Sequence, residues 1–261
     1  MEDGMSIGDY LIKQIYDNGA RHVFGLPGDY VLGLMKKISK SDLKMINTCD
    51  EQGAGFAADA YARMRGFGVV CVTYTVGGLK IANTTAQAFA EKSPVLVISG
   101  APGRVERAKN SMLHHKVNEF DDQMRIFERL TVASADLSDV ERAFSEIDRV
   151  ISAVLKYKRP GYIEVPRDVV PIVPQSCRTH KPAAAQKGEP GPIQEALKET
   201  LDMINSASKP AILAGVEVHR FGLGKQVMDL ARRANMPIAS TILGKSSIPE
   251  DDPLYMGIYM G

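Results

Sequence analysis

The stretch Val69-Val70-Cys71-Val72-Thr73-Tyr74, followed by Thr75-Val76-Gly77-Gly78 and then by Leu79, decides the fold of this chain. Its first part is apolar almost throughout and does not alternate, which predicts a strand buried on both faces of a parallel sheet. The two glycines predict a turn, and a helix is predicted from Leu79 to about Ala90. A parallel strand that leads into a helix through a glycine turn is one unit of an α/β fold.

The same alternation extends in both directions from this stretch. Before it, the sequence predicts a helix over 6–19, a strand over 22–24, a helix ending at 38, a strand over 45–47 and a helix over 51–63. After it come a strand over 95–99, a polar loop over 100–118, a strand near 130–133, a helix over 139–157 and a strand over 161–166. Two capping pairs, Ser6 with Asp9 and Ser138 with Glu141, support the first and last helices. This order predicts a doubly wound parallel sheet with helices on both faces.

A change of composition divides the chain. Residues 171–191 are rich in Pro, Ala, Lys and Gly and have no periodicity, which indicates a linker between domains 1–170 and 192–261. The second domain is predicted to contain helices over 193–204 and 223–234 and strands over 210–214 and 236–240. Only about 70 residues follow the linker, so we expect a partial α/β domain there.

Composition excludes several classes of partner. Against 32 Lys and Arg stand 31 Asp and Glu, so no overall charge attracts nucleic acid or an anionic membrane. The first residues, Met1-Glu-Asp-Gly-Met-Ser, lack the features of a secretory signal, and no apolar run approaches the roughly 18 residues of a membrane span. The cysteines Cys49, Cys71 and Cys177 form no C-x-x-C motif. We therefore expect a cytoplasmic protein with free thiols.

Glu51 is the first candidate for chemistry. An acidic residue in the first turn of a helix is commonly there because of the helix dipole. The helix that follows, 52–63, however carries Gly and Ala on successive turns, which permit another helix or a ligand to approach closely. Glu51 also follows the carboxyl end of a predicted parallel strand, where ligands of α/β proteins bind.

His114 and His115 are the second candidate. Adjacent histidines in a polar loop are commonly solvated and without function. We expect no metal site, because adjacent residues cannot easily aim both rings at one ion and no cluster with ligand spacing lies nearby in the sequence.

Two turns complete the candidates. The turn Thr75-Val76-Gly77-Gly78 has neither G-x-G-x-x-G nor a Lys-Ser/Thr ending, so close approach of its backbone to a flat ligand is the better interpretation than a phosphate loop. Asp29, in the turn 25–30, would on its own be interpreted as a helix N-cap.

Taken together, these segments resemble in order and spacing the N-terminal domain of the thiamine-diphosphate-dependent 2-oxo acid decarboxylases of the pyruvate and indolepyruvate type. The segments are Phe24–Tyr30, Asp50–Arg63, Val76–Gly78 and Leu113–His115. The resemblance covers residues 6–168 and continues more loosely to Gly261, where Met256-Gly257-Ile258-Tyr259 is similar to part of the middle domain of those enzymes. It implies the thiamine-diphosphate-binding fold, followed by an incomplete middle domain.

The resemblance also implies roles for residues. A glutamate at the position of Glu51 hydrogen-bonds a ring nitrogen of the cofactor's aminopyrimidine and favours the imino tautomer, which takes the proton from thiazolium C2. By the same resemblance, Asp29, His114 and His115 form a proton relay.

The turn after the central strand would line the pyrimidine pocket. The backbone positions implied for this role are Thr75, Val76 and Gly77.

The expected activity is that of a lyase that decarboxylates a 2-oxo acid without oxidation. The sequence reads Asp50-Glu51-Gln52-Gly53-Ala54-Gly55 where the family usually has Asn-Glu-Leu-Asn-Ala-Gly, and Tyr74–Leu79 departs from a Phe-Gly-Val-Gly-Glu-Leu type. Those departures leave the identity of the 2-oxo acid open. Related carboligases of the acetolactate synthase type usually carry Phe-Gln in place of the histidine pair, so His114-His115 favours decarboxylation.

Three other interpretations were considered. A carboligase and a non-catalytic regulatory or remnant pyrimidine domain both remain alternatives. A nicotinamide-binding domain is set aside, because the glycine fingerprint is missing.

The second half of the expected site is missing from the sequence. The family holds diphosphate and Mg²⁺ with Gly-Asp-Gly and a later Asn in a C-terminal domain, and this chain contains no Gly-Asp-Gly. We therefore expect the Mg²⁺ ligands outside this chain, and a chain that is inactive alone, as a fragment or as one subunit of a split enzyme. Because the family's site lies between subunits, we expect a homo-oligomer, dimeric or tetrameric, or a partner that carries the diphosphate-binding domain.

Overall fold

The computed structural model describes residues 4–175 and 190–260. The chain divides into two compact units, residues 1–182 and 183–261. Most of the expected linker 171–191 lies outside the described residues, and so does Cys177.

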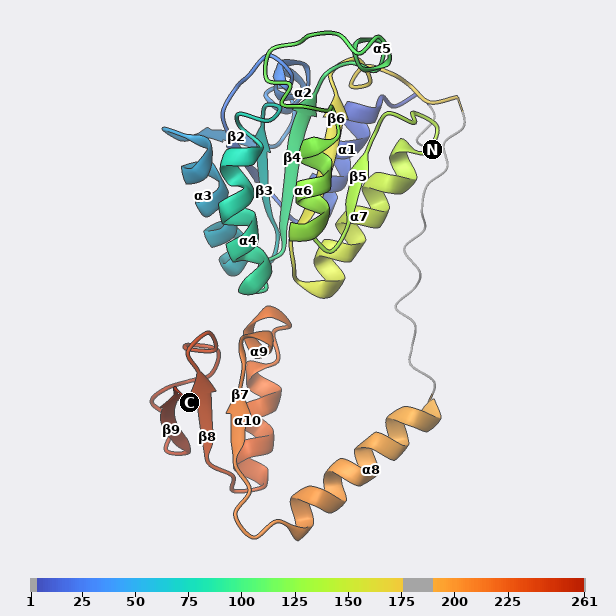
Figure 1. Ribbon diagram of the computed structural model, residues 1–261. Helices are drawn as coiled ribbons and strands as arrows, with labels where there is room; N and C mark the ends of the chain where they lie inside the picture. The colour runs from blue at the N-terminus through green and yellow to red at the C-terminus, as the bar shows by residue number, and fades with distance from the viewer. Residues whose placement is uncertain (1–3, 176–189, 261) are drawn as a thin grey trace. The chain divides into compact units, whose positions relative to one another are not determined.

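Unit 1 is built on a parallel sheet of six strands in the order β2-β1-β3-β4-β6-β5 (Figure 1). The strands are β1 (His22–Gly25), β2 (Lys44–Asn47), β3 (Gly68–Val72), β4 (Val95–Ala101), β5 (Ser134–Asp136) and β6 (Gly161–Pro166). Every residue of β3, β4 and β6 is buried, as expected for inner strands of a sheet with helices on both faces; β3 is apolar throughout, whereas β4 and β6 also bury Ser99 and Glu164. The predicted doubly wound parallel sheet is confirmed.

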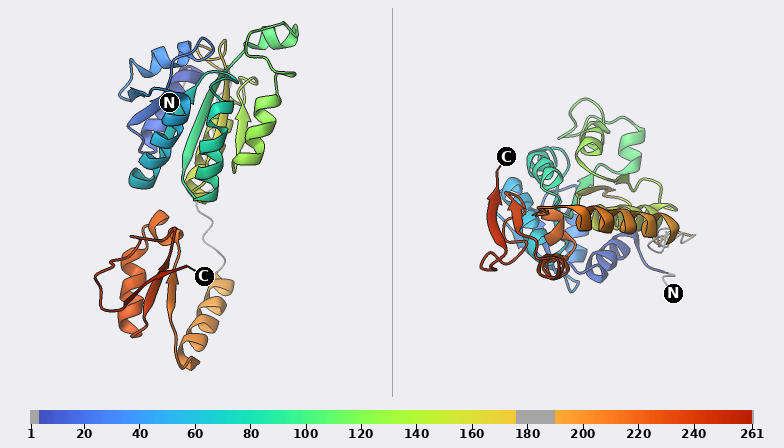
Figure 2. Two further views of the ribbon diagram at one scale, coloured as in Figure 1. Left: turned by 60° about the vertical axis from the view of Figure 1, so that its left-hand side comes forward. Right: turned by 90° about the horizontal axis from the view of Figure 1, so that it is seen from below.

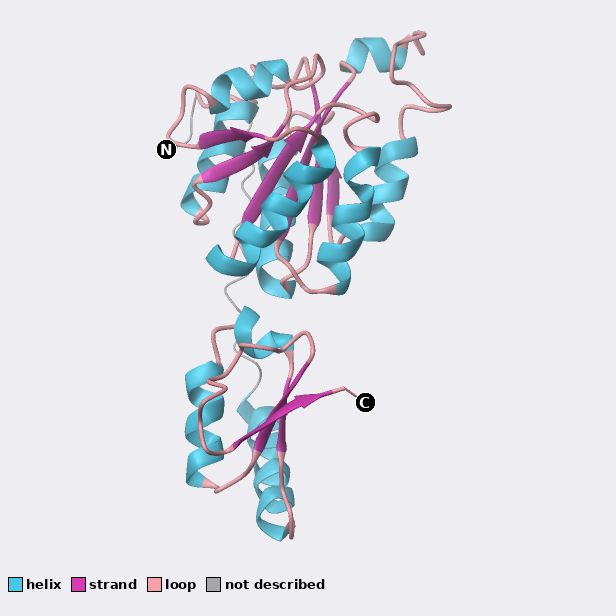
Figure 3. Ribbon diagram, turned by 90° about the vertical axis from the view of Figure 1, so that its left-hand side faces the viewer, coloured by secondary structure: helices cyan, strands magenta, loops and turns pink. Residues whose placement is uncertain are grey.

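Helices cover both faces of this sheet, as Figures 2 and 3 show. One face packs against α1 (Ile7–Asp17), α2 (Leu32–Ile38) and α7 (Ala143–Tyr157). The other packs against α3 (Glu51–Arg65), α4 (Ala82–Ala90) with its preceding turn η1 (Leu79–Ile81), and α6 (Asp122–Leu130). A short helix, α5 (Arg104–Ala108), lies in the loop after β4.

The small residues of α3 set its close packing. Ala54, Ala58 and Ala62, spaced four apart, form the buried stripe of this helix. A Cβ on Gly55 would lie 2.1 Å from Oγ1 of Thr84, so glycine lets α4 approach closely. The Gly and Ala pattern of this helix therefore serves helix packing.

The strand order reverses between β1 and β3. The chain passes from β1 outward to β2 and then returns to form β3 on the other side of β1. A Cβ on Gly25 would lie 1.8 Å from the carbonyl oxygen of Cys71, so only glycine permits this pairing. The loops after β1 and β3 diverge at this point, which is where open α/β sheets bind ligands.

Two local expectations are corrected and a third is confirmed. The strand expected near 130–133 is wrong: α6 occupies residues 122–130, and the strand β5 begins only at Ser134. Ser138 caps no helix, because its N–H and Oγ donate to Asp136 Oδ1 at 2.9 and 2.6 Å, and α7 begins at Ala143. Ser6 is confirmed as the N-cap of α1 and accepts a hydrogen bond from the N–H of Asp9 at 3.3 Å.

Unit 2 contains a smaller parallel sheet. Its strands are β7 (Ile212–Ala214), β8 (Ile238–Thr241) and β9 (Tyr255–Tyr259), in that order, and its helices are α8 (Pro190–Ser206), α9 (Val216–Arg220) and α10 (Gly224–Arg233). Its buried core consists of Ala214, Met228, Ile238 and Ile248. Among the described residues of both units, no helix combines the length and the apolar character that crossing a membrane requires.

Candidate functional site

The expected site residues follow four neighbouring strands. Asp29 follows β1, Glu51 opens α3 after β2, and the turn 75–78 follows β3. His114 and His115 lie in the loop after β4, on the side of the unit that carries α5 in Figure 1. Because the strands are parallel, their carboxyl ends meet at one edge of the sheet, beside the reversal between β1 and β3.

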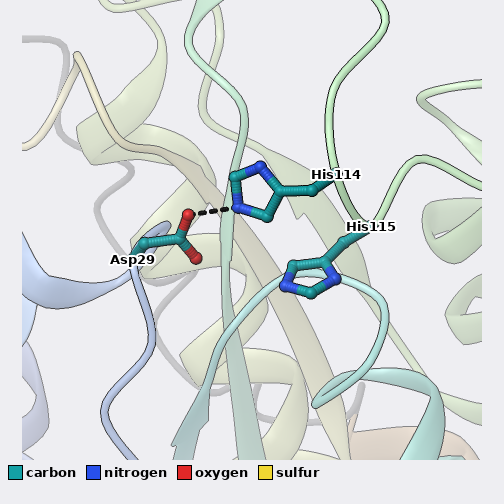
Figure 4. A group of neighbouring side chains, drawn as sticks. All are labelled: Asp29, His114 and His115. Carbon is teal, nitrogen blue, oxygen red and sulfur yellow. Dashed lines mark hydrogen bonds and ion pairs between the residues drawn. The ribbon is translucent and has the colours of Figure 1, made fainter.

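Asp29, His114 and His115 form a cluster at this edge (Figure 4). Nε2 of His114 donates a hydrogen bond to Oδ2 of Asp29. One ligand atom from each of the three residues lies within 4.8 Å of the others, and the two imidazole rings are 4.6 Å apart between centroids. A carboxylate that accepts from one ring nitrogen fixes the tautomer and orientation of the imidazole, so this cluster can hold and pass a proton.

Hydroxyl groups from the loop after β1 and from the end of β3 hold the histidine loop by its backbone. They are Tyr30 Oη, which donates to the carbonyl of His114 at 3.0 Å, Tyr74 Oη, which donates to the carbonyl of Phe120 at 2.8 Å, and Thr75 Oγ1, which donates to the carbonyl of His115. Burial raises the pKa of Tyr30 and of Tyr74, so both phenols remain donors at neutral pH. The sequence analysis missed these tyrosines, although a buried tyrosine at the end of a strand needs a partner for its hydroxyl.

A side chain of α6 holds the turn after β3. Its Thr75 has a φ of 43°, and the Thr75 N–H donates to Oε1 of Gln123 at 2.8 Å. A cavity of about 240 Å³ lies between this turn and the histidine loop, and its lining includes Thr75, Val76 and His115. Gln123 is a further residue that the sequence analysis missed, because the helix that carries it was not predicted.

Glu51 lies at the start of α3 and its side chain is 20% exposed. Its Oε2 is 3.3 Å from Nζ of Lys80, which also lies 3.1 Å from Oδ2 of Asp50. Asp50 caps α3 by accepting from the N–H of Gly53 at 2.7 Å, and this hydrogen bond together with Lys80 lowers the pKa of Asp50. Lys80 belongs to η1, so this ion pair joins Glu51 to the segment that follows the turn.

These residues fit an aminopyrimidine ring. A carboxyl at Glu51 can hydrogen-bond one ring nitrogen, and the turn borders a cavity at Val76, which is 52% exposed, whereas Thr75 and Gly77 are buried. A Cβ on Gly77 would lie only 3.0 Å from the carbonyl oxygen of Thr73, so this position of the turn also packs closely on the strand end. The fit rests on the carboxyl of Glu51 and on the cavity beside Thr75 and Val76.

The site does not fit Mg²⁺. This ion prefers six hard oxygen ligands, whereas the cluster at this edge offers one carboxylate, Asp29, and two imidazoles. Within residues 4–175 and 190–260 no second group of three His, Cys, Asp or Glu side chains comes as close together.

Comparisons with known proteins agree with this architecture. The family model described as "Thiamine pyrophosphate enzyme, N-terminal TPP binding domain" matches residues 5–126, and the model of the central domain of the same enzymes matches residues 197–261. The chain is 36% identical over 259 residues to the indole-3-pyruvate decarboxylase of Azospirillum brasilense, covering 98% of this chain and 47% of that protein. It is 36% identical over 261 residues to the pyruvate decarboxylase of Aspergillus parasiticus, covering 97% and 45%.

A third relative, pyruvate decarboxylase 1 of Pisum sativum, is 32% identical over 263 residues, covering 98% of this chain and 44% of that protein. The chain therefore spans about half the length of these relatives. On these matches the chain belongs to the thiamine pyrophosphate enzymes, among those similar to indole-3-pyruvate and pyruvate decarboxylases, and its residues 5–126 and 197–261 match their N-terminal and central domains.

Proposed function

We propose that this chain supplies the pyrimidine half of the active site of an enzyme that decarboxylates a 2-oxo acid without oxidation. The observation that carries the proposal is the cluster of Asp29, His114 and His115 on the same sheet edge as Glu51. Proton-passing groups on the same sheet edge as a carboxyl that can engage an aminopyrimidine suit a reaction that must generate and then protonate a carbanion. The relatives' names, indole-3-pyruvate and pyruvate decarboxylase, support the same substrate class.

Glu51 and the turn after β3 would bind the cofactor. Thiamine diphosphate, when bound, supplies the electron sink for the loss of CO₂. The carboxyl of Glu51 would hold a proton shared with a ring nitrogen, and the backbone of Thr75, Val76 and Gly77 would orient the ring.

The cluster would deliver the later proton. Asp29 orients the imidazole of His114 through the hydrogen bond between them. His115 lines the cavity beside the turn. Their expected role is to protonate the carbanion and to assist release of the aldehyde.

The diphosphate and Mg²⁺ would be held outside this chain, either in a domain joined to it or in a partner. This part of the proposal rests on the absence of Gly-Asp-Gly from the sequence and on the poor fit of the Asp29 cluster to Mg²⁺. The working enzyme would then be an oligomer, and the chain alone would not turn over substrate. The free thiols of Cys49 and Cys71 are in keeping with a cytoplasmic location.

The test uses the chain with its natural partners. The tagged chain is recovered from its source with whatever polypeptide it is joined to or associated with, and is assayed with pyruvate and indole-3-pyruvate in the presence of thiamine diphosphate and Mg²⁺. We expect aldehyde production, and a decrease in kcat on the order of 10²- to 10⁴-fold for Glu51→Gln. Glu128→Gln, an exposed position on α6, is the matched control and should retain activity. Equal activity of the two variants would contradict the role of Glu51.

The same assay separates the alternatives. A carboligase would form an acetohydroxy acid in place of free aldehyde. A regulatory pyrimidine domain would leave the activity of its partner unaltered when Glu51 is replaced, whereas the proposed enzyme would lose it.

A further inference from the structure

A buried polar network lies beneath the turn that follows β3. Its members are Ser99 in β4, Arg107 in α5, Gln123 in α6, and Tyr162 and Glu164 in β6. Ser99, Gln123, Tyr162 and Glu164 have no exposed surface, and Arg107 Nη2 lies 2.5 Å from Glu164 Oε1. Polar groups buried to this extent are stable only when they are hydrogen-bonded, so the positions of these side chains are tightly linked.

The network dictates how the carboxamide of Gln123 is oriented. The hydroxyl of Tyr162 donates to Glu164 Oε2 at 2.6 Å, so its oxygen accepts from Gln123 Nε2, also at 2.6 Å. The hydroxyl of Ser99 donates to the carbonyl of Gly100 at 2.9 Å and accepts from the same Nε2 at 2.9 Å. Because both neighbours accept, the amide nitrogen must face them, and Oε1 is directed at the Thr75 N–H.

Thr75 connects this carboxamide to both halves of the candidate site. A φ of 43° is unfavourable for a β-branched residue and persists only where the surroundings hold it. The hydrogen bonds of Thr75 do so: its N–H donates to Gln123, its Oγ1 donates to the carbonyl of His115, and its own carbonyl accepts from the N–H of Leu79 at 2.7 Å. A shift of Gln123 would therefore move the cofactor-facing turn and the histidine loop together.

Gly78 leaves the space that this carboxamide needs. A Cβ on Gly78 would lie 1.9 Å from Gln123 Oε1. The φ of Gly78 is −59°, an ordinary helical value, so backbone conformation does not require glycine there. The requirement is steric and comes from Gln123.

We propose that Gln123 is a positioning residue that sets the turn 75–77 and, through Thr75, the backbone of His115. The effect of Gln123 on catalysis rests on the proposed function. Its link to Thr75 and His115 rests on the hydrogen bonds between these residues. Gln123 touches neither the cofactor nor the substrate in this scheme. It acts through the left-handed conformation of Thr75.

The structural part is tested on the chain alone with Gln123→Met, which retains the length of the side chain but cannot accept from Thr75. Amide hydrogen exchange and the NMR signals of the His114 and His115 rings are compared with those of the unaltered chain. We expect exchange at Thr75 to accelerate by about 10- to 100-fold beyond any change at core amides, and the His115 signals to shift.

Phe144→Leu is the control, because Phe144 is buried in α7 on the opposite face of the sheet. Phe144→Leu should accelerate amide exchange in the core and should not accelerate exchange at Thr75 beyond that of the core amides. If Gln123→Met accelerates Thr75 no more than core amides and leaves the His115 signals unaltered, the proposed link is wrong.

A double-mutant cycle covers the case in which one variant folds poorly. In the unaltered chain, Gly78→Ala should accelerate amide exchange at Thr75. In a Gln123→Ala background it should accelerate this exchange little further, because Oε1 of Gln123, the atom that would clash with the new Cβ, is then absent. Equal effects of Gly78→Ala in both backgrounds would contradict the link. In the recovered enzyme, Gln123→Met should lower kcat by at least about 10-fold with little change in KM. Loss of Thr75 protection without any decarboxylation in the unaltered enzyme would refute only the proposed function.

Discussion

Two halves of the same sheet edge differ in burial. Beneath the turn after β3, Thr75, Gln123 and Glu164 are buried and hydrogen-bonded within the chain. Beside them, the side chains of Asp29 and His114 are 42% and 55% exposed although they are hydrogen-bonded to each other. The chain thus fixes the backbone of the site by itself, whereas the groups expected to move protons remain open to water.

This difference indicates what the site still needs. Exposed carboxylates and imidazoles are screened by water, and closing an active site strengthens their interactions. A second surface laid over Asp29 and His114 would exclude water without requiring the turn to rearrange. On the proposed function, the turn after β3 is a preformed scaffold, and Asp29 and His114 are ionisable groups that would become effective on assembly.

The largest loss of stability is expected for a substitution between β1 and β3, where the two strands approach most closely at Gly25. Gly25→Ala would place a Cβ 1.8 Å from the Cys71 carbonyl oxygen and force β1 and β3 apart. We expect a loss of about 3 kcal/mol or more in the free energy of unfolding, measured by urea denaturation. Gly33→Ala in α2, where a Cβ meets nothing within 4 Å, is the control and should be neutral or stabilising. Equal destabilisation by both substitutions would contradict the close pairing of the strands.

A smaller loss is expected within the buried network. Tyr162→Phe removes a hydroxyl that accepts from Gln123 and donates to Glu164. Leaving these buried groups without a partner should cost about 1–3 kcal/mol of unfolding free energy. Tyr157→Phe on the exposed end of α7 should change the stability little. A neutral Tyr162→Phe would mean that the network does not stabilise the scaffold.

The stability contributed by the segment 118–122, which joins the histidine loop to α6, should depend on pH. Asp122 accepts from the N–H groups of Glu119 and Asn118 at 2.9 and 3.0 Å, and these hydrogen bonds lower its pKa below 3.8. A carboxyl whose pKa is lowered in the folded state stabilises it above pH 3.8, and this contribution disappears as the pH falls through the lower, folded value.

The urea midpoints of the unaltered chain and of Asp122→Ala should therefore differ at pH 6, and the difference should shrink as the pH is lowered below 3.8. The neighbouring Asp121→Ala, which removes a side chain whose ion pair with Arg125 lies on the helix surface, is the control. A gap for Asp122→Ala that stays constant with pH would show that the carboxylate charge has no part in holding this segment.

The smallest effect on stability is expected in the open half. Asp29→Ala removes a partner of His114 but leaves no buried group unsatisfied, so the free energy of unfolding should change by less than about 0.5 kcal/mol. The same substitution in the recovered enzyme should lower decarboxylation. A large loss of stability would show that Asp29 belongs to the scaffold.

The sequence predicted the parallel sheet and the candidate residues at its edge because both depend on local patterns. Apolar strands such as 69–72 and the glycine turn after them are visible without knowledge of their partners. Gln123 was not predicted, because α6 carries alternating charges and buries only Gln123 and Phe127 among its residues. The role of the buried Gln123 follows from its hydrogen bonds to Thr75, Tyr162 and Ser99, which are distant in the sequence.

The false capping box shows the same limit. Ser138 followed by Glu141 has the right spacing, yet Ser138 bonds to Asp136, and Glu141 accepts from the N–H of Gln175 at 3.1 Å. A short motif therefore indicates a helix start only when no nearby side chain competes for its hydrogen bonds.

On the proposed function, this chain carries a preformed half of an active site. The decisive measurement is the rate of CO₂ release from pyruvate by the purified chain alone, with thiamine diphosphate and Mg²⁺ in excess, beside the same assay on the enzyme recovered from its source. We expect release only by the recovered enzyme. Sustained release by the chain alone would contradict the proposal that it carries only half of the site.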